Sequence, residues 1–483
     1  MQRRVIQRVL GILLAGFSVT MLPPILVGTL YEDDAMTPFL LAFAITLITG
    51  LILWYPVRKS RDDLRLRDGF LIVVLFWTVL GAFGALPLLF CQSLTIGITD
   101  AVFESISGLT TTGATVITNL DELPKSILFY RQGLQWLGGM GIIVLAVAIL
   151  PMLGVGGMQL YRAETPGPVK DSKLTPRIKE TAKALWYIYL SLTVACALGY
   201  WLAGMNVFDA ISHSFSTVAI GGFSTHNESI GYFRSAPIET VSIIFMLLSG
   251  VNFGLHFITW KSQGLRHYLR DTEFKTYFIV IISISIIAAI FLRISEVYLS
   301  WDDAFAKAIF HAVSIATTTG FTTSHYYFWP SFLPLLLLLA SFIGGCTGST
   351  GGGMKVIRVY LLVKQGSREM LRLIHPNAKI AVKIGSKAVD GRVIEAVWGF
   401  FSAYMGVFII MLLLLVASGL DQVTAFSAVT ATLNNLGPGL GEVGANYTSI
   451  NDFSKWVLCL GMLLGRLEIF TLLVVLTPAF WRR

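Results

Sequence analysis

Four short segments with the same layout recur along the chain, and they constrain its fold more than any other feature. They cover residues 100–115, 209–225, 306–323 and 424–440, and are called here the first to fourth copies. Each is a helix-compatible run that ends in small or polar residues and a glycine, and each lies between two long apolar stretches. Internal repetition of this kind indicates one structural unit that occurs four times.

The helical part of each copy is too short to cross a membrane. About 10–12 residues at ~1.5 Å per residue cover roughly half of the ~30 Å hydrocarbon core. Such a helix has to re-enter, with its non-helical end buried in protein or lining a watery cavity. We expect Asp100, Asp209 and Thr424 to cap three of these helices, and the third copy to start at Asp302 or Asp303.

The composition is that of a membrane protein. Of the 483 residues, 55% are hydrophobic and 13% are charged, whereas soluble proteins carry roughly 25% charged residues. About ten runs are long and apolar enough to span a bilayer. They lie at about 9–30, 37–56, 70–91, 127–153, 184–204, 238–260, 276–293, 331–343 with a continuation at 354–363, 394–418 and 455–478. We therefore predict an all-α polytopic membrane protein.

The basic residues gather in alternate connections between these runs. They lie at the N-terminus, in 58–67, 162–183, 261–275 and 364–392, and at the C-terminal Arg482 and Arg483. This asymmetry predicts that both termini and all of these connections face the cytoplasm. The three later connections are also candidate docking surfaces for a regulatory partner, or contacts to anionic lipid.

Four re-entrant loops around one axis would form a cation site. Glycine permits backbone that aims successive carbonyls inward, and rings of carbonyl oxygens replace the hydration shell of an alkali cation. The C-terminal ends of the short helices add partial negative charge. The expected filter glycines are Gly113, Gly222, Gly320 and Gly437. For each copy taken alone, the alternative is a helix C-cap with a Schellman-type glycine.

The copies differ in how closely they match a potassium filter. Thr-Thr-Thr-Gly in the first and third copies looks like a reduced TVGYG filter. Ile-Gly-Gly-Phe in the second copy and Asn-Leu-Gly-Pro in the fourth are more degenerate. We therefore expect one short selective stage and moderate discrimination of K+ from Na+.

The motifs SGLTTTGAT, AIGGFSTH, ATTTGFTT, GGCTGSTGGGMK and NNLGPGLG are together specific. On them the chain resembles the TrkH/KtrB/HKT superfamily of potassium transporters, and within it the TrkH family, over essentially its whole length. The resemblance implies four pseudo-symmetric helix–re-entrant loop–helix repeats around one pore, after two N-terminal transmembrane helices. The expected boundaries are 1–67 for the N-terminal pair and 68–160, 161–265, 266–392 and 393–483 for the repeats.

The resemblance also implies a function and its partners. It implies a K+-translocating subunit of the bacterial inner membrane, a homodimer with a pore in each protomer, and a TrkA-type cytoplasmic ring of nucleotide-binding domains as regulator. K+ is then the transported ion, and no organic cofactor or nucleic acid is expected on this chain. The implied K+ ligands are the carbonyls of Thr111, Thr112, Ile220, Gly221, Thr318, Thr319, Asn435 and Leu436.

A glycine-rich loop at residues 344–353 interrupts an apolar run. Because lipid-exposed backbone does not tolerate such an interruption, the loop has to be buried in protein or line water. The resemblance implies an intramembrane gate, anchored by Lys355. The alternatives are a tight helix-packing site and, with no preceding strand and no GK[ST], a phosphate loop. The expected gate glycines are Gly344, Gly345, Gly348, Gly351, Gly352 and Gly353.

Charged residues within the apolar runs have two interpretations. Arg466, with Glu468 nearby, forms either a structural ion pair or, as the resemblance implies, a pore charge that repels K+ in the closed state. Arg131 is expected to snorkel to the interface. Glu104, His213 and His311 share one offset before the filter glycine, where the fourth copy has Ala428; we expect them to brace the short helices, the alternative being an ion or proton site.

These observations predict a gated K+ uptake pore rather than an enzyme. Flow would be driven by membrane potential and concentration. The alternative is a symporter that couples K+ to H+ or Na+. A cofactor-bearing membrane enzyme is disfavoured, because paired intramembrane histidines, nucleotide motifs and Ser/His/Asp arrangements do not appear in the sequence.

Overall fold

The computed structural model describes residues 2–60, 65–141, 178–262, 264–330 and 332–482. Its regular secondary structure is helical apart from one two-stranded antiparallel hairpin of β1 (Lys383–Ile384) and β2 (Lys387–Ala388). The expected boundary between residues 160 and 161, the end of the apolar run 127–153 and most of the basic segment 162–183 lie outside the described residues.

An N-terminal pair of helices packs against the rest of the chain. α1 (Arg3–Ser18) continues into α2 (Leu22–Tyr31), where Pro23 and Pro24 suit the first turn of a helix. α3 (Met36–Trp54) returns alongside α1. Their backbones touch at two glycines, because a Cβ added at Gly50 would lie 2.6 Å from the Ala15 nitrogen and one at Gly11 would lie 2.7 Å from the Trp54 nitrogen.

Each of the four copies forms a helix of 12 or 16 residues that lies between other helices of its own group. The first group comprises α4 (Leu66–Gly84), α5 (Leu86–Phe90), the short α6 (Ile98–Leu109) and α7 (Lys125–Gly139). The second comprises α11 (Ile178–Leu202), the short α12 (Val207–Val218), α13 (Ala236–Ser249), α14 (Phe253–Ser262) and α15 (Arg266–Arg270). The third comprises α16 (Thr272–Ile294), the short α17 (Trp301–Ala316), α18 (Phe332–Ile343) and α19 (Val356–Ile374). The fourth comprises α20 (Gly391–Ala417), the short α21 (Gln422–Leu433), α22 (Asp452–Arg466), α23 (Phe470–Leu476) and α24 (Pro478–Trp481).

Single 3-10 turns complete the described secondary structure. They are η1 (Val19–Met21), η2 (Tyr55–Val57), η3 (Leu120–Glu122), η4 (Ser229–Phe233), η5 (Tyr326–Phe328) and η6 (Gly441–Val443).

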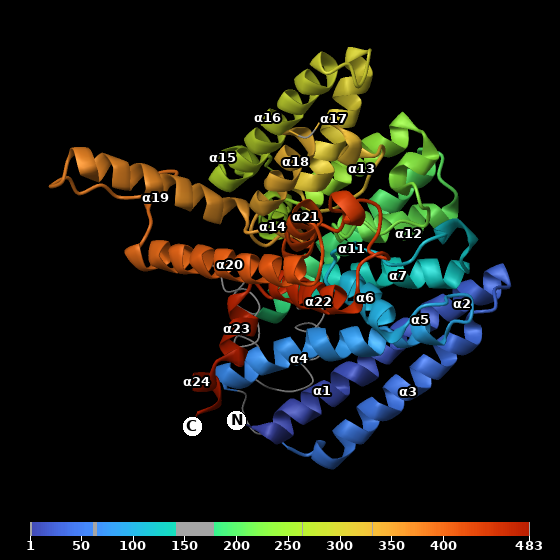
Figure 1. Cartoon of the computed structure of the whole chain (residues 1–483). Helices are drawn as coiled ribbons and strands as arrows, with labels where there is room; N and C mark the ends of the chain where they lie inside the picture. Colours follow the sequence, from blue (N-terminus) through green and yellow to red (C-terminus); the bar gives the residue numbers. More distant parts are fainter. Residues whose placement is uncertain (1, 61–64, 142–177, 263, 331, 483) are drawn as a thin grey trace.

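Each short helix packs on the helix that follows the previous copy. α12 lies against α7, α17 against α13, α21 against α18, and α6 against α22. The last contact joins the fourth group to the first, so the order of packing closes on itself. In Figure 1, α6 and α21 lie near the centre of the molecule, with α17 above them and α12 toward the right.

Six of the predicted apolar runs form continuous helices that could span a membrane, and two others are broken by a bend. Among the described residues, six helices are long and apolar enough to cross a membrane, or up to eight if each bent pair is one span. The run 238–260 is broken between α13 and α14, which meet at 92°, and the run 455–478 is broken between α22 and α23, at 116°. Both were predicted as continuous runs. Left-handed φ values at Glu468 and Ile469 explain the second break.

The predicted helix caps are wrong by one turn. α12 and α21 are capped by Asn206 and Asp421, whose side chains accept backbone N–H groups, and α6 starts after Gly97. The third copy starts earlier than expected, with Ser300 as its cap. In α12, α17 and α21, a polar residue just before the helix accepts the free N–H groups of the first turn.

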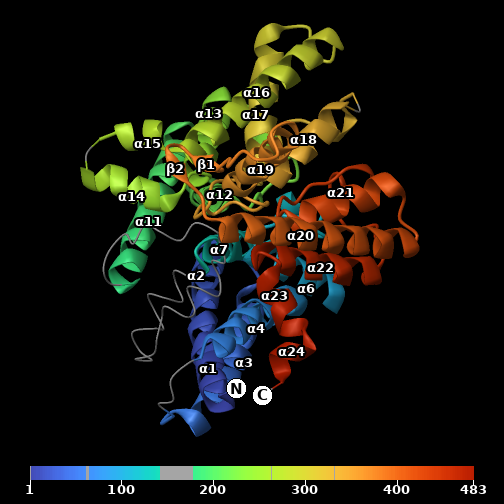
Figure 2. The ribbon, with the colours of Figure 1, turned by 90° about the vertical axis from the view of Figure 1, so that its left-hand side faces the viewer.

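Both termini lie side by side at one end of the molecule (Figures 1 and 2). At the C-terminus, the Arg67 guanidinium donates to the Arg482 carbonyl at 2.8 Å. α19 and α20 extend together away from the centre, with the β1–β2 hairpin in the connection between them (Figures 1 and 2).

Candidate ion pathway

All four copies end in the same backbone turn. In the first copy the Thr111 N–H donates to the Gly108 carbonyl at 3.0 Å, and the Thr112 N–H donates to the Ser107 carbonyl at 2.9 Å. The other copies repeat both bonds at the same offsets. The first residue of the turn has a left-handed φ each time: 54° at Thr111, 55° at Ile220, 68° at Thr318 and 53° at Asn435. This pattern is a Schellman cap.

The cap does not use the glycine, so the glycine-cap alternative is wrong. The left-handed capping residue stands two positions before the glycine in every copy. Left-handed backbone costs roughly 1–3 kcal/mol for a residue other than glycine, and Ile220 is β-branched. The surrounding structure therefore imposes this turn. The glycine two positions later is not needed to end the helix.

The four glycines approach the neighbouring copies in a closed ring. A Cβ added at Gly113 would lie 2.1 Å from the Gly221 carbonyl oxygen, and one at Gly222 would lie 2.0 Å from that of Thr319. The next two contacts are Gly320 to the Leu436 oxygen, at 2.2 Å, and Gly437 to the Thr112 oxygen, at 2.6 Å. Any side chain would collide at each position. All four glycines also have positive φ, at 81°, 80°, 84° and 98°.

The eight residues with the predicted ligand carbonyls therefore lie together, around this ring. Every one of them is buried, and they are Thr111, Thr112, Ile220, Gly221, Thr318, Thr319, Asn435 and Leu436. One side-chain bond also closes the ring, because the Asn435 amide donates to the Thr112 hydroxyl at 2.9 Å.

Glu104, His213 and His311 brace the chain just beyond the glycine of their own copy. Glu104 accepts the Val116 N–H at 2.9 Å. His213 Nε2 lies 2.9 Å from the Ser224 hydroxyl, and the equivalent His311 atom lies 3.2 Å from the Ser324 carbonyl. The expectation of bracing is confirmed for these contacts.

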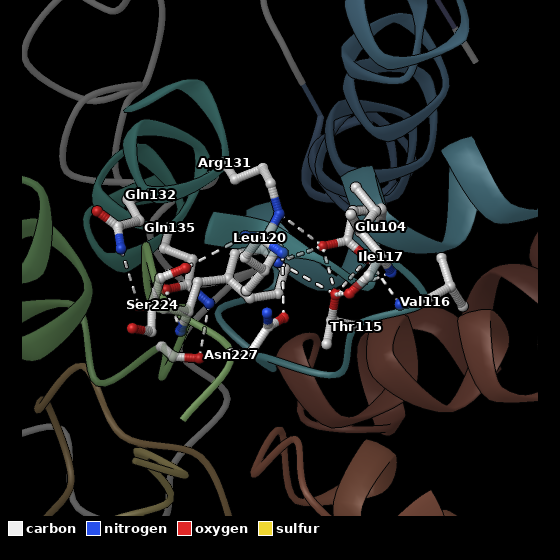
Figure 3. Close-up of polar contacts among 12 residues, drawn as sticks. Glu104, Thr115, Val116, Ile117, Leu120, Arg131, Gln132, Gln135, Ser224 and Asn227 are labelled. Carbon is white, nitrogen blue, oxygen red and sulfur yellow. Dashed lines mark hydrogen bonds and ion pairs between the residues drawn. The ribbon is translucent and has the colours of Figure 1, made fainter. Parts of the chain in front are cut away.

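Arg131 does not snorkel to an interface, and that expectation is wrong. Its side chain is 1% exposed and forms an ion pair with Glu104, with Nη2 2.6 Å from Oε1 (Figure 3). It also donates to the Thr115 hydroxyl at 3.1 Å and to the Ser224 carbonyl at 3.3 Å. A buried guanidinium needs a carboxylate partner, and Glu104 is supplied by α6, the preceding α-helix of the same group. Arg131 thereby joins the first and second copies.

Sequence reasoning missed two further residues on α7, Gln132 and Gln135. Both amides are buried and donate to backbone carbonyls of the second copy (Figure 3). The available signal was a pair of amides three residues apart in a largely apolar run, which places both on one helix face.

The glycine-rich loop lies against the ends of three short helices. Its Thr350 hydroxyl donates to the Val218 carbonyl at 3.0 Å, its Gly352 N–H to the Thr318 hydroxyl at 2.7 Å, and its Gly353 N–H to the Asn434 carbonyl at 3.1 Å. Val218, Thr318 and Asn434 belong to the second, third and fourth copies. No helix runs through residues 344–355, so the helix-packing alternative is wrong.

Glycine is required at several loop positions. Gly344, Gly348 and Gly353 have φ values of 68°, 74° and 72°. A Cβ at Gly352 would lie 2.0 Å from the Asn434 carbonyl oxygen, one at Gly351 2.9 Å from that of Thr317, and one at Gly345 2.7 Å from the Ser349 hydroxyl. The loop is thus packed directly beneath the ring. The buried Lys355 ammonium donates back to the Gly351 carbonyl, a contact that suits an anchor.

Arg466 connects the glycine-rich loop with the first copy. Its guanidinium donates to the Thr111 hydroxyl at 3.2 Å, to the Thr350 carbonyl at 3.2 Å and to the Gly138 carbonyl. Arg466 thus contacts the first copy, and the glycine-rich loop contacts the other three. Glu468 forms an ion pair with Arg358, whose guanidinium lies 4.3 Å from the Phe400 ring centroid.

Comparisons with known proteins agree with this geometry. Residues 36–482 match the family model TrkH, described as a cation transport protein. The chain belongs to the TrkH family. It is 60% identical to the Trk system potassium uptake protein TrkH of Vibrio parahaemolyticus and 58% identical to that of Escherichia coli K12, in both cases over all of both chains. It is 42% identical to TrkG of Escherichia coli K12 over 99% of each chain.

A solved structure of the TrkH family has the same fold. The crystal structure of the potassium transporter TrkH from Vibrio parahaemolyticus superposes with a TM-score of 0.91 at 58% identity, over the whole of both chains. The TrkH family is a family of transporters rather than enzymes. Together with the apolar helices, family membership makes the chain a multi-pass membrane protein.

Proposed function

We propose that this chain takes up K+ through the ring formed by its four copies, arranged as pseudo-symmetric helix–re-entrant loop–helix repeats around one pore. The observation that carries the proposal is the closed sequence of glycine–carbonyl contacts from the first copy to the fourth and back. Carbonyl oxygens around one axis replace the hydration shell of K+. The names of the TrkH relatives, as potassium uptake proteins, support the choice of ion.

The glycine-rich loop and Arg466 form the gate in this proposal. The loop contacts the second, third and fourth copies and Arg466 contacts the first. A positive charge at that place repels K+. Opening then requires both groups to move away from the ring.

The wider setting follows from the same proposal. The chain lies in the inner membrane of a bacterium, with both termini and the basic connections in the cytoplasm. It works as a homodimer with a TrkA-type nucleotide-binding ring. The basic segments 261–275 and 364–392 supply docking surface for that ring.

Uptake of 86Rb+ into liposomes, with and without competing Na+, tests the ring. Gly113→Ser puts a side chain against the Gly221 carbonyl, so it should lower discrimination between K+ and Na+. An unaltered ratio in a folded variant means that this ring is not the filter. Unitary currents in a planar bilayer test the pore itself, and a strict co-ion stoichiometry would replace it with the symport mechanism.

Flux without the regulatory ring tests the gate. Deleting residues 348–350 removes the bond between Thr350 and Val218 and shortens the loop. Basal 86Rb+ flux should rise, and Arg466→Gln should raise it as well because the positive charge is lost. Unchanged or lower flux from well-folded variants would argue against the gate.

A further inference from the structure

Residues 221–224, in the loop that follows the short helix of the second copy, accept hydrogen bonds from α7 of the first group. Three side chains of α7 point at this loop (Figure 3). Arg131 donates to the Ser224 carbonyl at 3.3 Å, and Gln132 donates to the Phe223 carbonyl at 3.2 Å. The Arg131 guanidinium also stacks over the Phe223 ring, 4.3 Å from its centroid.

Gln135 makes the most direct of these contacts. Its Nε2 donates to the Gly221 carbonyl at 2.6 Å, and its Oε1 accepts the Phe223 N–H at 3.0 Å. One amide therefore binds the residues on both sides of Gly222. We propose that Gln135 is a positioning residue that fixes the second copy in its cation-selective shape. The proposal rests on the function of the ring proposed above.

The sequence of the second copy is adapted to this amide. A Cβ added at Gly221 would lie 2.4 Å from the Gln135 Cδ and 2.5 Å from its Oε1. Gly221 stands where the first and third copies have threonine. Glycine is thus required at position 221 because the Gln135 side chain of α7 occupies the space of a Cβ. This contact is a structural reason why the second copy matches a potassium filter poorly at this position.

The third copy shows what Gln132 replaces. There the Ser314 hydroxyl, on the short helix itself, donates to the Phe321 carbonyl at 2.7 Å. The equivalent Ser216 hydroxyl of the second copy is buried and has no hydrogen-bond partner among the described residues. The Phe223 carbonyl takes its bond from α7 instead. The third copy is thus held partly by its own helix, whereas the second is held by the neighbouring group.

Gln135 acts on the ion through the backbone. The Gly221 carbonyl has two lone pairs, so one can accept the Gln135 amide while the other is available to a cation. Hydrogen bonding also polarises the carbonyl and holds its direction. Loss of the amide should therefore change discrimination between ions more than it changes the total amount of folded protein.

The first test replaces the amide by an apolar group of similar size. Gln135→Leu in the full-length protein should lower the K+/Na+ uptake ratio in liposomes about fivefold, as expected for loss of a buried hydrogen bond. Gln7→Leu is the matched control, because Gln7 also donates its amide to a backbone carbonyl, that of Leu53, but lies on α1. A folded Gln135→Leu variant with the parental ratio overturns the proposal.

The second test concerns the close contact between Gly221 and the Gln135 side chain. Gly221→Ala should fail to fold or lose most uptake, because its Cβ meets the Gln135 amide. Gln135→Ala combined with Gly221→Ala vacates that space, so the double variant should recover folding while its K+/Na+ ratio stays low. A double variant that is no better than Gly221→Ala alone overturns the proposal, even if Gln135→Leu does not fold.

A third variant separates this proposal from the proposed function. If Gly113→Ser changes the ratio and Gln135→Leu does not, the ring is the filter and Gln135 does not position it. If neither changes the ratio, the ring itself is not the filter.

Discussion

The first and third copies share a sequence, Thr-Thr-Thr-Gly, that the second and fourth lack, yet all four share one backbone. Thr111 and Ile220 have φ values of 54° and 55°, and the two following glycines have 81° and 80°. Threonine and isoleucine are both β-branched, a class of residue that rarely has positive φ, and both adopt the same left-handed turn here. Because different sequences adopt one backbone, packing rather than local sequence imposes the turn. Different residues hold the turn in place in each copy.

The support varies from copy to copy. The first copy depends on Glu104 and the second on α7, as described above. In the fourth, the Tyr447 hydroxyl donates to the Gly437 carbonyl at 2.7 Å, and the Tyr326 hydroxyl donates to the Gly439 carbonyl at 3.1 Å. Substitutions that remove one support should therefore affect the copies unequally.

The largest effect is expected at the junction of the first and second copies. Arg131→Met leaves the Glu104 carboxylate buried without its partner. Removing one member of a buried ion pair costs about 3–5 kcal/mol, so the melting temperature of the purified protein should fall steeply. Glu104→Leu combined with Arg131→Met should recover part of this loss. A single variant with parental stability would show that the Arg131–Glu104 ion pair does not stabilise the fold.

A smaller effect should distinguish the second copy from the third. Ser314→Ala leaves the Phe321 carbonyl without its side-chain donor and should destabilise the protein by about 1–3 kcal/mol. Ser216→Ala, at the equivalent position, removes a hydroxyl with no described partner and should change stability little. Thermal unfolding of both variants in the same detergent measures the difference. Equal losses would contradict the assignment of support to α7.

The smallest effect concerns pH. His226 lies between Asp209, at 3.3 Å, and Asp121, and so connects the outer turns of the first two groups. Burial lowers the pKa of His226, but the two carboxylates outweigh this and raise it above its ordinary value. For Asp121, burial raises the pKa of the carboxyl, but the hydrogen bonds from His226 and Asn227 lower this pKa by more, so that it lies below its ordinary value. The ring of His213 stacks nearby, 6.4 Å away.

The direction of the pH effect follows from these shifts. A raised histidine pKa stabilises the fold fully below the ordinary value of about 6.5 and stops doing so as the pH rises through the raised value. The melting temperature should therefore fall slightly as the pH rises from about 6.5 through the raised pKa of His226, by an amount that corresponds to less than about 1 kcal/mol. His226→Gln should remove this pH dependence. A slope that persists in the variant would exclude His226 as its source.

Much of the architecture was accessible from the sequence because it depends on local patterns. Six of the about ten predicted apolar runs correspond to spanning helices in the described part of the chain, and the position of each copy predicted a short helix that ends before a glycine. The motifs also indicated the TrkH family. Helix caps were misplaced, because the choice between Asn206 and Asp209 depends on where the chain leaves the preceding turn. The bends at α13–α14 and α22–α23 were missed because both halves are apolar.

Length, hydropathy and repetition are properties of the chain alone, and they indicate a helical membrane protein with four glycine-ended copies. Which groups meet across the copies depends on how the helices pack in the folded protein. The pairing of Arg131 with Ser224, of Glu468 with Arg358, and of Gln135 with Gly221 joins residues far apart in sequence. Such pairs form because a buried charge or amide has to find a partner in the folded protein, and no local pattern specifies which one.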